Sequence, residues 1–206
     1  PQYQDDIKKA FSTIEKVING TIDSSKFDKH YQVIDTQSEF IPYLEILQKS
    51  DRIVVDIETT SLSPRKGAVL GIALSTKEHE GIYVTAEVAE LFIDELAEVF
   101  REKTCIFHNS KFDMSFLKYE FGFEFPKFED TMLLHYCLEE AVGTHGLKQL
   151  AMRFTDLGDY EKELDDYKKT FARKNKIKLE DFNYGMLPVD ILAPYACKDA
   201  DGTFQL

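Results

Sequence analysis

Two acidic residues, Asp56 and Glu58, end the apolar run Ile53–Val55 and precede the polar turn Ser61–Pro64. A β-strand alternates its side chains between two faces, so the spacing i, i+2 places both carboxylates on one face. Ile57 then points the other way, into a core. Two neighbouring carboxylates repel each other unless a cation lies between them. The pair therefore indicates a metal site, and a strand end with solvated acids is the alternative.

A further acid lies in the stretch His108–Asp113 (HNSKFD), where a predicted strand ends and a helix begins. Asn109 and Asp113 are four residues apart, so we expect them to share one helix face near the first turn. The N-terminus of a helix favours negative charge, which would help to keep Asp113 ionised. The structural alternative is a capping Asn followed by a surface Asp.

A tyrosine and an acid share one face of the last predicted helix, which covers residues 190–205. Tyr195 and Asp199 are four residues apart, although a surface hydrogen-bonded pair is the alternative for these two residues alone. Asp130 directly precedes another predicted helix. We interpret it as the N-cap of that helix rather than as a metal ligand.

Taken together, these stretches resemble the DEDDy family of 3′–5′ exonucleases, and most of all the proofreading domain of family-A DNA polymerases. The stretch DIETTSL is similar to the first motif of that family, HNSKFD to the second and YACKDADGTFQL to the third. The segment FEDTMLLHYCLEEAVGTHGLKQLAMRF also resembles this domain, so the resemblance covers about residues 32–206. The catalytic residues that it implies are Asp56, Glu58, Asp113, Tyr195 and Asp199.

The resemblance also implies the chemistry, which is phosphodiester hydrolysis with two divalent ions, Mg²⁺ or Mn²⁺. Such ions lie about 4 Å apart and stabilise the attacking and leaving oxygens together. Asp56 would bridge both ions, and Glu58 and Asp199 would help to hold the ion that activates the water. Asp113 would act mainly through the second ion, by way of water. Tyr195 would orient the attacking water, because a phenol with a pKa of about 10 is a poor base at neutral pH.

Four residues are predicted to contact the substrate. Leu62 matches a family position that wedges against the 3′-terminal base, and a buried turn residue is the alternative. Thr59 would offer its backbone N–H to the terminal nucleotide, and Asn109 would bind the penultimate phosphate or sugar. Phe171 is a candidate for base stacking, because it lies in the basic stretch Lys168–Lys178 and single strands favour exposed rings beside basic groups. A solvated helix face is the alternative for that stretch.

The elements that must hold these residues follow from the spacing of apolar residues. Strands are expected over residues 53–57, 69–74, 81–84 and 104–107. Helices are expected after Thr36 and over residues 88–101, 110–121, 131–138, 147–154 and 190–205. Strands dominate first and helices later, which predicts an α/β domain with a mixed sheet. The resemblance implies the ribonuclease H-like fold, with a central mixed five-stranded sheet flanked by helices.

The length of 206 residues suits one packed domain with an appendage. We expect residues 1–30 to be a linker or an N-terminal helical arm, because apolar residues recur at helical spacing over residues 5–19. Residues 31–206 would form the exonuclease domain. The sequence starts without Met, so we interpret it as part of a longer chain with a polymerase domain downstream. Three widely spaced cysteines argue against a disulfide framework or a zinc site and fit a reducing compartment.

The main functional expectation is a monomeric module that trims the single-stranded 3′ end of DNA. The net charge of −12 argues against nucleic acid at face value, but local basic groups matter more than the total. No apolar run approaches the roughly 20 residues that span a bilayer, and we expect the cytoplasm of a bacterium or of a phage-infected cell. An RNase D-like exoribonuclease would use the same acids on the same fold. A catalytically silent domain that braces a polymerase is a third interpretation.

Overall fold

The structure, a computed structural model, describes residues 30–206, so the arm predicted over residues 1–30 lies outside the described residues apart from His30. The strands are β1 (His30–Ile34), β2 (Arg52–Thr59), β3 (Val69–Ser75), β4 (Glu80–Thr85), β5 (Thr104–Phe107) and β6 (Phe128–Asp130). The helices are α2 (Gln37–Lys49), α3 (Ala86–Leu91), α4 (Ile93–Glu102), α5 (Ser110–Phe121), α6 (Thr131–Leu138), α7 (Leu147–Phe154), α8 (Lys162–Asn175) and α9 (Val189–Gln205). Two short 3₁₀ helices, η1 (Leu179–Asp181) and η2 (Tyr184–Met186), connect α8 to α9.

The described strands form one mixed sheet of six strands in the order β1-β4-β3-β2-β5-β6. Strands β2, β3 and β4 form an antiparallel meander, as predicted. Strand β1 is parallel to β4, and β5 is parallel to both β2 and β6. The structure therefore corrects the expected five strands to six. The edge strand β6 has three residues, too few for an alternating pattern to appear in the sequence.

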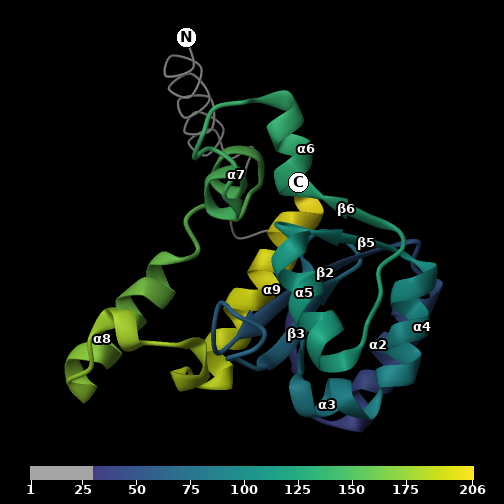
Figure 1. Cartoon of the computed structure of the whole chain (residues 1–206), viewed down its shortest axis with the longest axis horizontal. Coiled ribbons are helices and arrows are strands. Elements are labelled where there is room, and N and C mark those ends of the chain that lie inside the picture. Colours follow the sequence, from purple (N-terminus) through teal and green to yellow (C-terminus); the bar gives the residue numbers. More distant parts are fainter. Residues whose placement is uncertain (1–29) are drawn as a thin grey trace, which may run out of the picture.

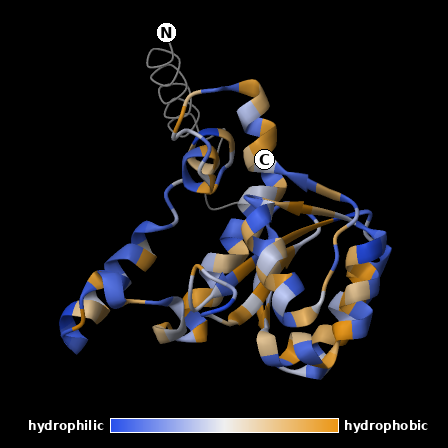
Figure 2. Cartoon of the chain, viewed as in Figure 1, coloured by the Kyte–Doolittle hydropathy of each residue, from blue (hydrophilic) through white to orange (hydrophobic). Residues whose placement is uncertain are grey.

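The sheet is covered on both faces, and each face has its own apolar core (Figure 1). Helices α2 to α5 pack on one face, and α9 crosses the other, where it contacts β1, β2, β3 and β4. In β2, Ile53, Val55 and Ile57 belong to the first core and Val54 to the second. Figure 2 shows largely hydrophobic strands between helices of mixed character. Because side chains alternate along β2, Asp56 and Glu58 lie on the α9 face.

Two helical regions differ from the predicted ones. The helix expected over residues 88–101 is broken at Phe92, whose backbone leaves the helical region (φ −124°, ψ 30°). The ring of Phe92 packs on Phe40 with ring centroids 5.0 Å apart. Apolar spacing continues through a break of one residue, so the sequence does not reveal it. Helix α8, which the sequence did not predict, is largely hydrophilic and extends away from the sheet (Figures 1 and 2).

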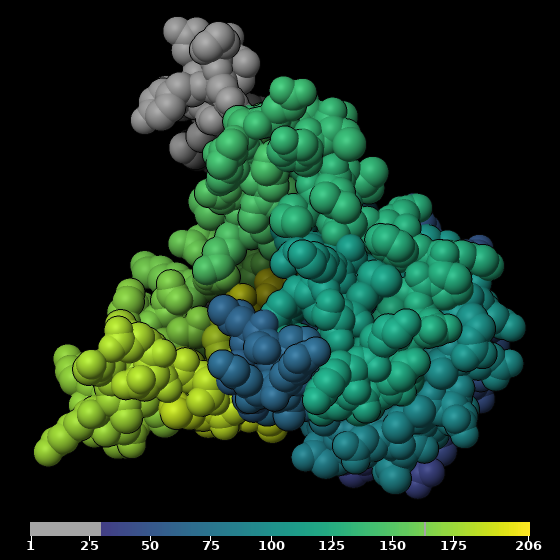
Figure 3. Space-filling model, viewed as in Figure 1, coloured from purple at the N-terminus to yellow at the C-terminus, as the bar shows by residue number. Residues whose placement is uncertain are grey.

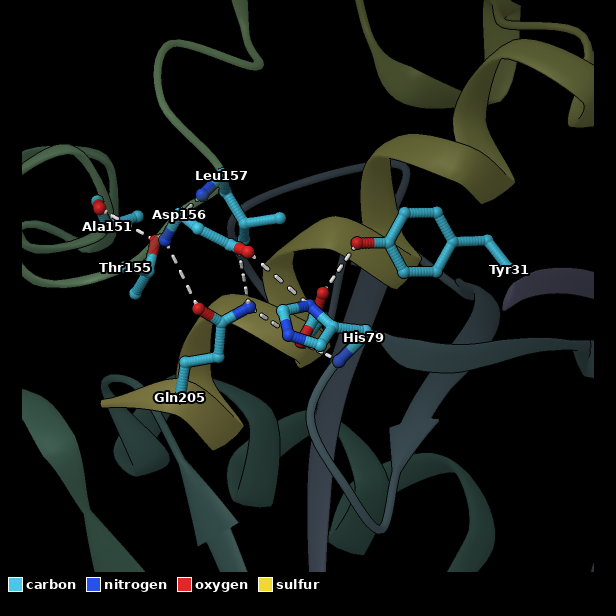
Figure 4. A network of polar contacts seen from close by, with 8 residues as sticks. Tyr31, His79, Ala151, Thr155, Asp156, Leu157 and Gln205 are labelled. Atoms are coloured by element: carbon cyan, nitrogen blue, oxygen red, sulfur yellow. Dashed lines mark hydrogen bonds and ion pairs between the residues drawn. The ribbon is translucent and has the colours of Figure 1, made fainter. Parts of the chain in front are cut away.

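Helix α9 is tied to the sheet by Asp201, whose side chain is fully buried. Its carboxylate accepts hydrogen bonds from the Tyr31 hydroxyl (2.6 Å), the His79 backbone N–H (2.8 Å) and the Gln205 side chain (3.0 Å). Figure 4 shows these partners meeting from β1, from the turn before β4 and from α9 itself. Hydrogen bonds to a carboxylate are stronger than neutral ones, so this network gives α9 a defined position over the sheet.

Candidate active site

Asp56 and Glu58 lie on β2, inside the sheet, and both side chains face α9. Their carboxylates meet that of Asp199, and oxygens of the three groups all lie within 4.8 Å of one another. Within residues 30–206, this is the one group of acidic, His or Cys side chains whose geometry could hold a metal ion. Glu58 and Asp199 are buried rather than solvated. The three acids are called the acidic cluster below.

Two glycines of the sheet allow close packing next to the strand that carries Asp56 and Glu58. Strands β2 and β3 change register directly after Glu58, where the ladder becomes irregular. Gly71 lies opposite Glu58, and a Cβ at this position would come within 2.4 Å of the Tyr83 ring. Gly81 lets α9 approach, since a Cβ there would lie 3.0 Å from the Cβ of Cys197. A side chain at Gly71 would displace the Tyr83 ring, and one at Gly81 would push α9, which carries Asp199, away from β4.

Asp113 reaches the acidic cluster from the other layer of the fold. It lies in the first turn of α5, whose Phe116 and Leu117 pack in the core opposite α9, and it is 3% exposed. It lies outside the close group of three, but its charge contributes to a raised pKa of Asp56. Contrary to the prediction, Asn109 does not share a helix face with Asp113. The helix starts only after Asn109, which adopts a left-handed conformation (φ 71°, ψ 51°).

The fold disfavours the charged form of the four carboxyl groups of the site. Burial raises the pKa of Asp56, Glu58 and Asp113 well above the ordinary values, and neighbouring carboxylates raise each pKa further. Burial also raises the pKa of Asp199 to about 6, although hydrogen bonds from two tyrosines oppose this shift. A cation would replace the lost solvation and cancel the repulsion. Carboxylate oxygens suit a hard divalent ion such as Mg²⁺, so the residues present fit such an ion.

Tyr195 lies one helical turn before Asp199 and is surrounded by groups that the sequence did not reveal. Its hydroxyl donates to Oε1 of Glu161 at 3.1 Å, and its ring lies near the rings of Tyr160 and Tyr184. Tyr160 donates its own hydroxyl to Asp199. Burial raises the pKa of Tyr195, so the phenol keeps its proton at neutral pH. No apolar periodicity marks the loop that carries Tyr160 and Glu161, which explains why the sequence missed them.

The basic stretch Lys168–Lys178 divides between two environments. Lys168 turns inward: its Nζ lies 3.0 Å from the Tyr184 hydroxyl and 4.6 Å from the centre of that ring. It also interacts electrostatically with Glu58 and Asp199. The other Lys and Arg side chains of the stretch are exposed, as expected for a solvated helix face. Spacing alone did not distinguish the inward lysine from its neighbours.

The four predicted substrate contacts have different surroundings. Leu62 is 89% exposed on the loop after β2, so the alternative of a buried turn residue is wrong. Thr59 ends β2, with its hydroxyl bonded to a carbonyl of the following turn, and Asn109 is exposed. Phe171 on α8 packs against two other aromatic rings, with centroids 6.1 and 5.7 Å away. The described contacts of Phe171 are therefore with other rings rather than with the acidic cluster.

A cleft of about 580 Å³ opens beside the acidic cluster. It is lined by Asp199, Tyr195 and Glu161, and by the segment around Gly146 that leads into α7. Figure 3 shows a hollow between the loop after β2, the segment before α7 and helix α8, with α9 at its floor. Asp199 is therefore the acid of the cluster that lines this cleft.

Asp130 is a structural residue, as predicted. It is the N-cap of α6, where its side chain accepts hydrogen bonds from the backbone N–H groups of Met132 (2.9 Å) and Leu133 (3.2 Å). It also accepts from the backbone N–H groups of Ser110 (2.7 Å) and Asn109 (3.2 Å). One carboxylate therefore caps two helices and fixes the start of α5, which carries the acid of the other layer.

Solved structures with the same architecture identify the fold. The structure of Trypanosoma brucei RNase D in complex with RNA U12 aligns with a TM-score of 0.66 at 16% identity, over 88% of this chain and 63% of that chain. Brucella melitensis NrnC with bound Mg²⁺ aligns with a TM-score of 0.58 at 16% identity, over 84% of this chain and 74% of that chain. At this identity the likeness defines the fold alone, which is the ribonuclease H-like fold.

Sequence relatives define the family. The chain belongs to the 3′–5′ exonuclease family of family-A DNA polymerases, which its residues 31–206 match. The DNA polymerase of Escherichia phage T5 is 40% identical over 205 residues, covering 94% of this chain. DNA polymerase I of Borreliella burgdorferi is 26% identical over 189 residues, covering 85% of this chain. The alignments span 24% and 19% of the length of these two polymerases. The family is metal-dependent, in agreement with the acidic cluster.

Proposed function

We propose that this chain removes nucleotides from the single-stranded 3′ end of DNA by metal-dependent hydrolysis, as the proofreading module of a family-A DNA polymerase. The observation that carries the proposal is the close group of Asp56, Glu58 and Asp199 in a member of the 3′–5′ exonuclease family. Similarity to phage and bacterial DNA polymerases supports DNA as the substrate and a polymerase domain as the partner. It also supports action in the cytoplasm of a bacterium or of a phage-infected cell. No described helix is long and apolar enough to cross a membrane.

Each residue of the site has its own task in the proposed reaction. Asp56, Glu58 and Asp199 would hold divalent ions, Mg²⁺ or Mn²⁺, and we expect two ions. Bound ions supply positive charge that polarises the phosphate and lowers the pKa of the attacking water. Asp113 would act on the second ion by way of water. Tyr195 would orient the attacking water, since its raised pKa makes it unsuitable as a base at neutral pH.

The substrate strand would lie in the cleft with its 3′ end at the acidic cluster. Leu62 projects from the loop after β2 and would pack on the terminal base, because an exposed apolar side chain gains from covering a base. The backbone N–H of Thr59 and the side chain of Asn109 would bind the last two nucleotides. Lys168 adds positive charge at the edge of the acidic cluster.

The test is a time course on single-stranded DNA labelled at its 5′ end, with Mg²⁺ or with a chelator. We expect a ladder that shortens from the 3′ end, that is lost with chelator and is lost in Asp56→Ala and Asp199→Ala. Tyr195→Phe should retain part of the activity. Asp190→Ala is the matched control, because Asp190 is an exposed acid on the same helix as Asp199. Full activity in Asp56→Ala would contradict the proposed mechanism.

The same assay on RNA of the same sequence separates the competing functions. The DNA polymerase relatives favour faster cleavage of DNA than of RNA. Faster cleavage of RNA would instead favour an exoribonuclease like the RNase D whose fold it shares. No cleavage of either polymer, by a folded chain supplied with Mg²⁺ and Mn²⁺, would favour a bracing domain.

A further inference from the structure

Glu161 is a buried acid that lies outside the acidic cluster and is 6% exposed. It directly precedes α8, and two other helices contact its carboxylate. Oε1 accepts the hydrogen bond from the Tyr195 hydroxyl of α9 at 3.1 Å. Oε2 forms an ion pair with Nζ of Lys148 from α7. Helices α7, α8 and α9 therefore meet at one carboxylate beside the cleft.

We propose that Glu161, paired with Lys148, is a positioning residue. It accepts the hydrogen bond that the Tyr195 hydroxyl donates, so the Tyr195 oxygen is left to accept a hydrogen bond from the attacking water. This inference rests on the proposed function, because it assigns the direction of the hydrogen bond by which Tyr195 orients that water. Glu161 itself would touch neither the substrate nor the water.

The direction of the bond follows from the chemistry of a phenol. A tyrosine hydroxyl has one proton to donate and lone pairs that accept. A phenol with an ordinary pKa of about 10 carries this proton at neutral pH, and Glu161 can only accept when it is ionised. The Tyr195 oxygen is then left to accept a hydrogen bond from water. A water oxygen has two lone pairs, and a bound cation would take one of them. A water that donates to Tyr195 would keep the second lone pair free to attack phosphorus, whereas a hydrogen bond accepted from Tyr195 would occupy it.

Tyr195 also lies within hydrogen-bonding reach of Asp199, the competing acceptor, but the surroundings of the two acids favour Glu161. The Asp199 carboxylate already accepts the Tyr160 hydroxyl and belongs to the acidic cluster. Glu161 is outside the cluster, so its oxygens stay available when the cluster holds cations. Lys148 balances the charge of Glu161, which would otherwise add one more carboxylate to an acidic region.

The kinetic test compares Glu161→Gln with the parent chain on single-stranded DNA. Glutamine keeps the size of the side chain but loses the charge, so the bond to Tyr195 weakens. We expect kcat to fall about tenfold and KM to stay within about twofold. The matched control is Glu129→Gln, because Glu129 also pairs with a cation on another element, Arg52 of β2. The control should retain the parent kcat, and a parent-like kcat in Glu161→Gln overturns the proposal.

A double substitution separates positioning from general damage. In the Tyr195→Phe background the hydroxyl is absent, so Glu161→Gln should change kcat by less than about twofold. An equal loss of kcat in both backgrounds means that Glu161 acts through stability or through another residue, and it overturns the proposal. Failure of the proposed function is recognised separately, because the parent chain would then not cleave DNA with Mg²⁺.

Fluorine NMR gives a readout that needs neither activity nor metal. The chain is prepared with meta-fluorotyrosine, and the Tyr195 signal is assigned by its loss in Tyr195→Phe. The contact predicts that Glu161→Gln shifts this signal and that Glu129→Gln leaves it in place. A Tyr195 signal that is unchanged in Glu161→Gln overturns the inferred hydrogen bond.

Discussion

Asp199 carries part of the electrostatic cost of burying the acids of the site. It is 8% exposed, and burial is the main reason that its pKa rises from 3.8 to about 6. Between these two values the folded chain binds more protons than the unfolded chain, so folding stability falls as the pH rises through this window. The cost at neutral pH is on the order of 3 kcal/mol. A cation in the acidic cluster would offset this cost.

We expect Asp199→Asn to be more stable than the parent chain by about 1–3 kcal/mol at neutral pH in the absence of metal. The advantage should shrink as the pH falls through about 6 towards 3.8 and should level off above that window. Urea unfolding at a series of pH values, in chelator, measures it. Asp190→Asn, an exposed change on the same helix, should show no such dependence. An advantage that grew toward acid would contradict the burial argument.

Leu62 offers a residue-scale test of substrate contact, because it is 89% exposed and adds little to the core. We expect Leu62→Ala to change the free energy of unfolding by less than about 0.5 kcal/mol. The KM for single-stranded DNA should nevertheless rise several-fold, since the apolar contact with the terminal base is lost. Leu138→Ala on α6, where Leu138 is 86% exposed, is the control and should leave KM unchanged.

At the scale of elements, Asp130 links the two helices that start beside β6. It accepts hydrogen bonds from the first backbone N–H groups of α6 and from those of α5. We expect Asp130→Ala to lower the free energy of unfolding by about 2–4 kcal/mol, because two caps and a buried charge are lost together. Denaturant unfolding measures the change. Asp94→Ala in the first turn of α4, which is exposed and caps nothing, should cost less than about 0.5 kcal/mol.

At the scale of the whole molecule, the acids of the site come from both layers of the fold. Asp56, Glu58 and Asp199 lie on the α9 side, and Asp113 comes from α5 on the other side. Ions held between them would bind the folded chain but not the unfolded one. At a metal concentration of one hundred times Kd this linkage adds about 2.7 kcal/mol.

Mg²⁺ or Mn²⁺ should therefore raise the melting temperature of the parent chain, and chelator should reverse the effect. Thermal unfolding in each ion, followed by a tryptophan-independent signal such as circular dichroism, suits a chain that has no Trp. The shift should be lost in Asp56→Asn and kept in Asp190→Asn. An equal shift in Asp56→Asn would place the bound ion elsewhere.

The sequence predicted the elements with strong apolar patterns and missed those without them. The meander of β2, β3 and β4 and the helix that carries Tyr195 follow from apolar spacing. The three-residue strand β6 and the break at Phe92 leave no trace in that spacing. Helix α8 is too polar for its buried residues to form a recognisable stripe.

The sequence alone predicted the candidate acids and the tyrosine of the site, because the side-chain period along a strand or helix is a local property. It put Asp56 and Glu58 on one face and Tyr195 one turn before Asp199. Only the tertiary structure decided what surrounds them, because Tyr160, Glu161 and Lys148 come from segments whose positions depend on packing. It also decided that Asn109 lies just before α5 and makes no side-chain cap, while Asp130, twenty-one residues away, accepts the hydrogen bond of its backbone N–H. Such contacts depend on distances in space, and no local spacing records them.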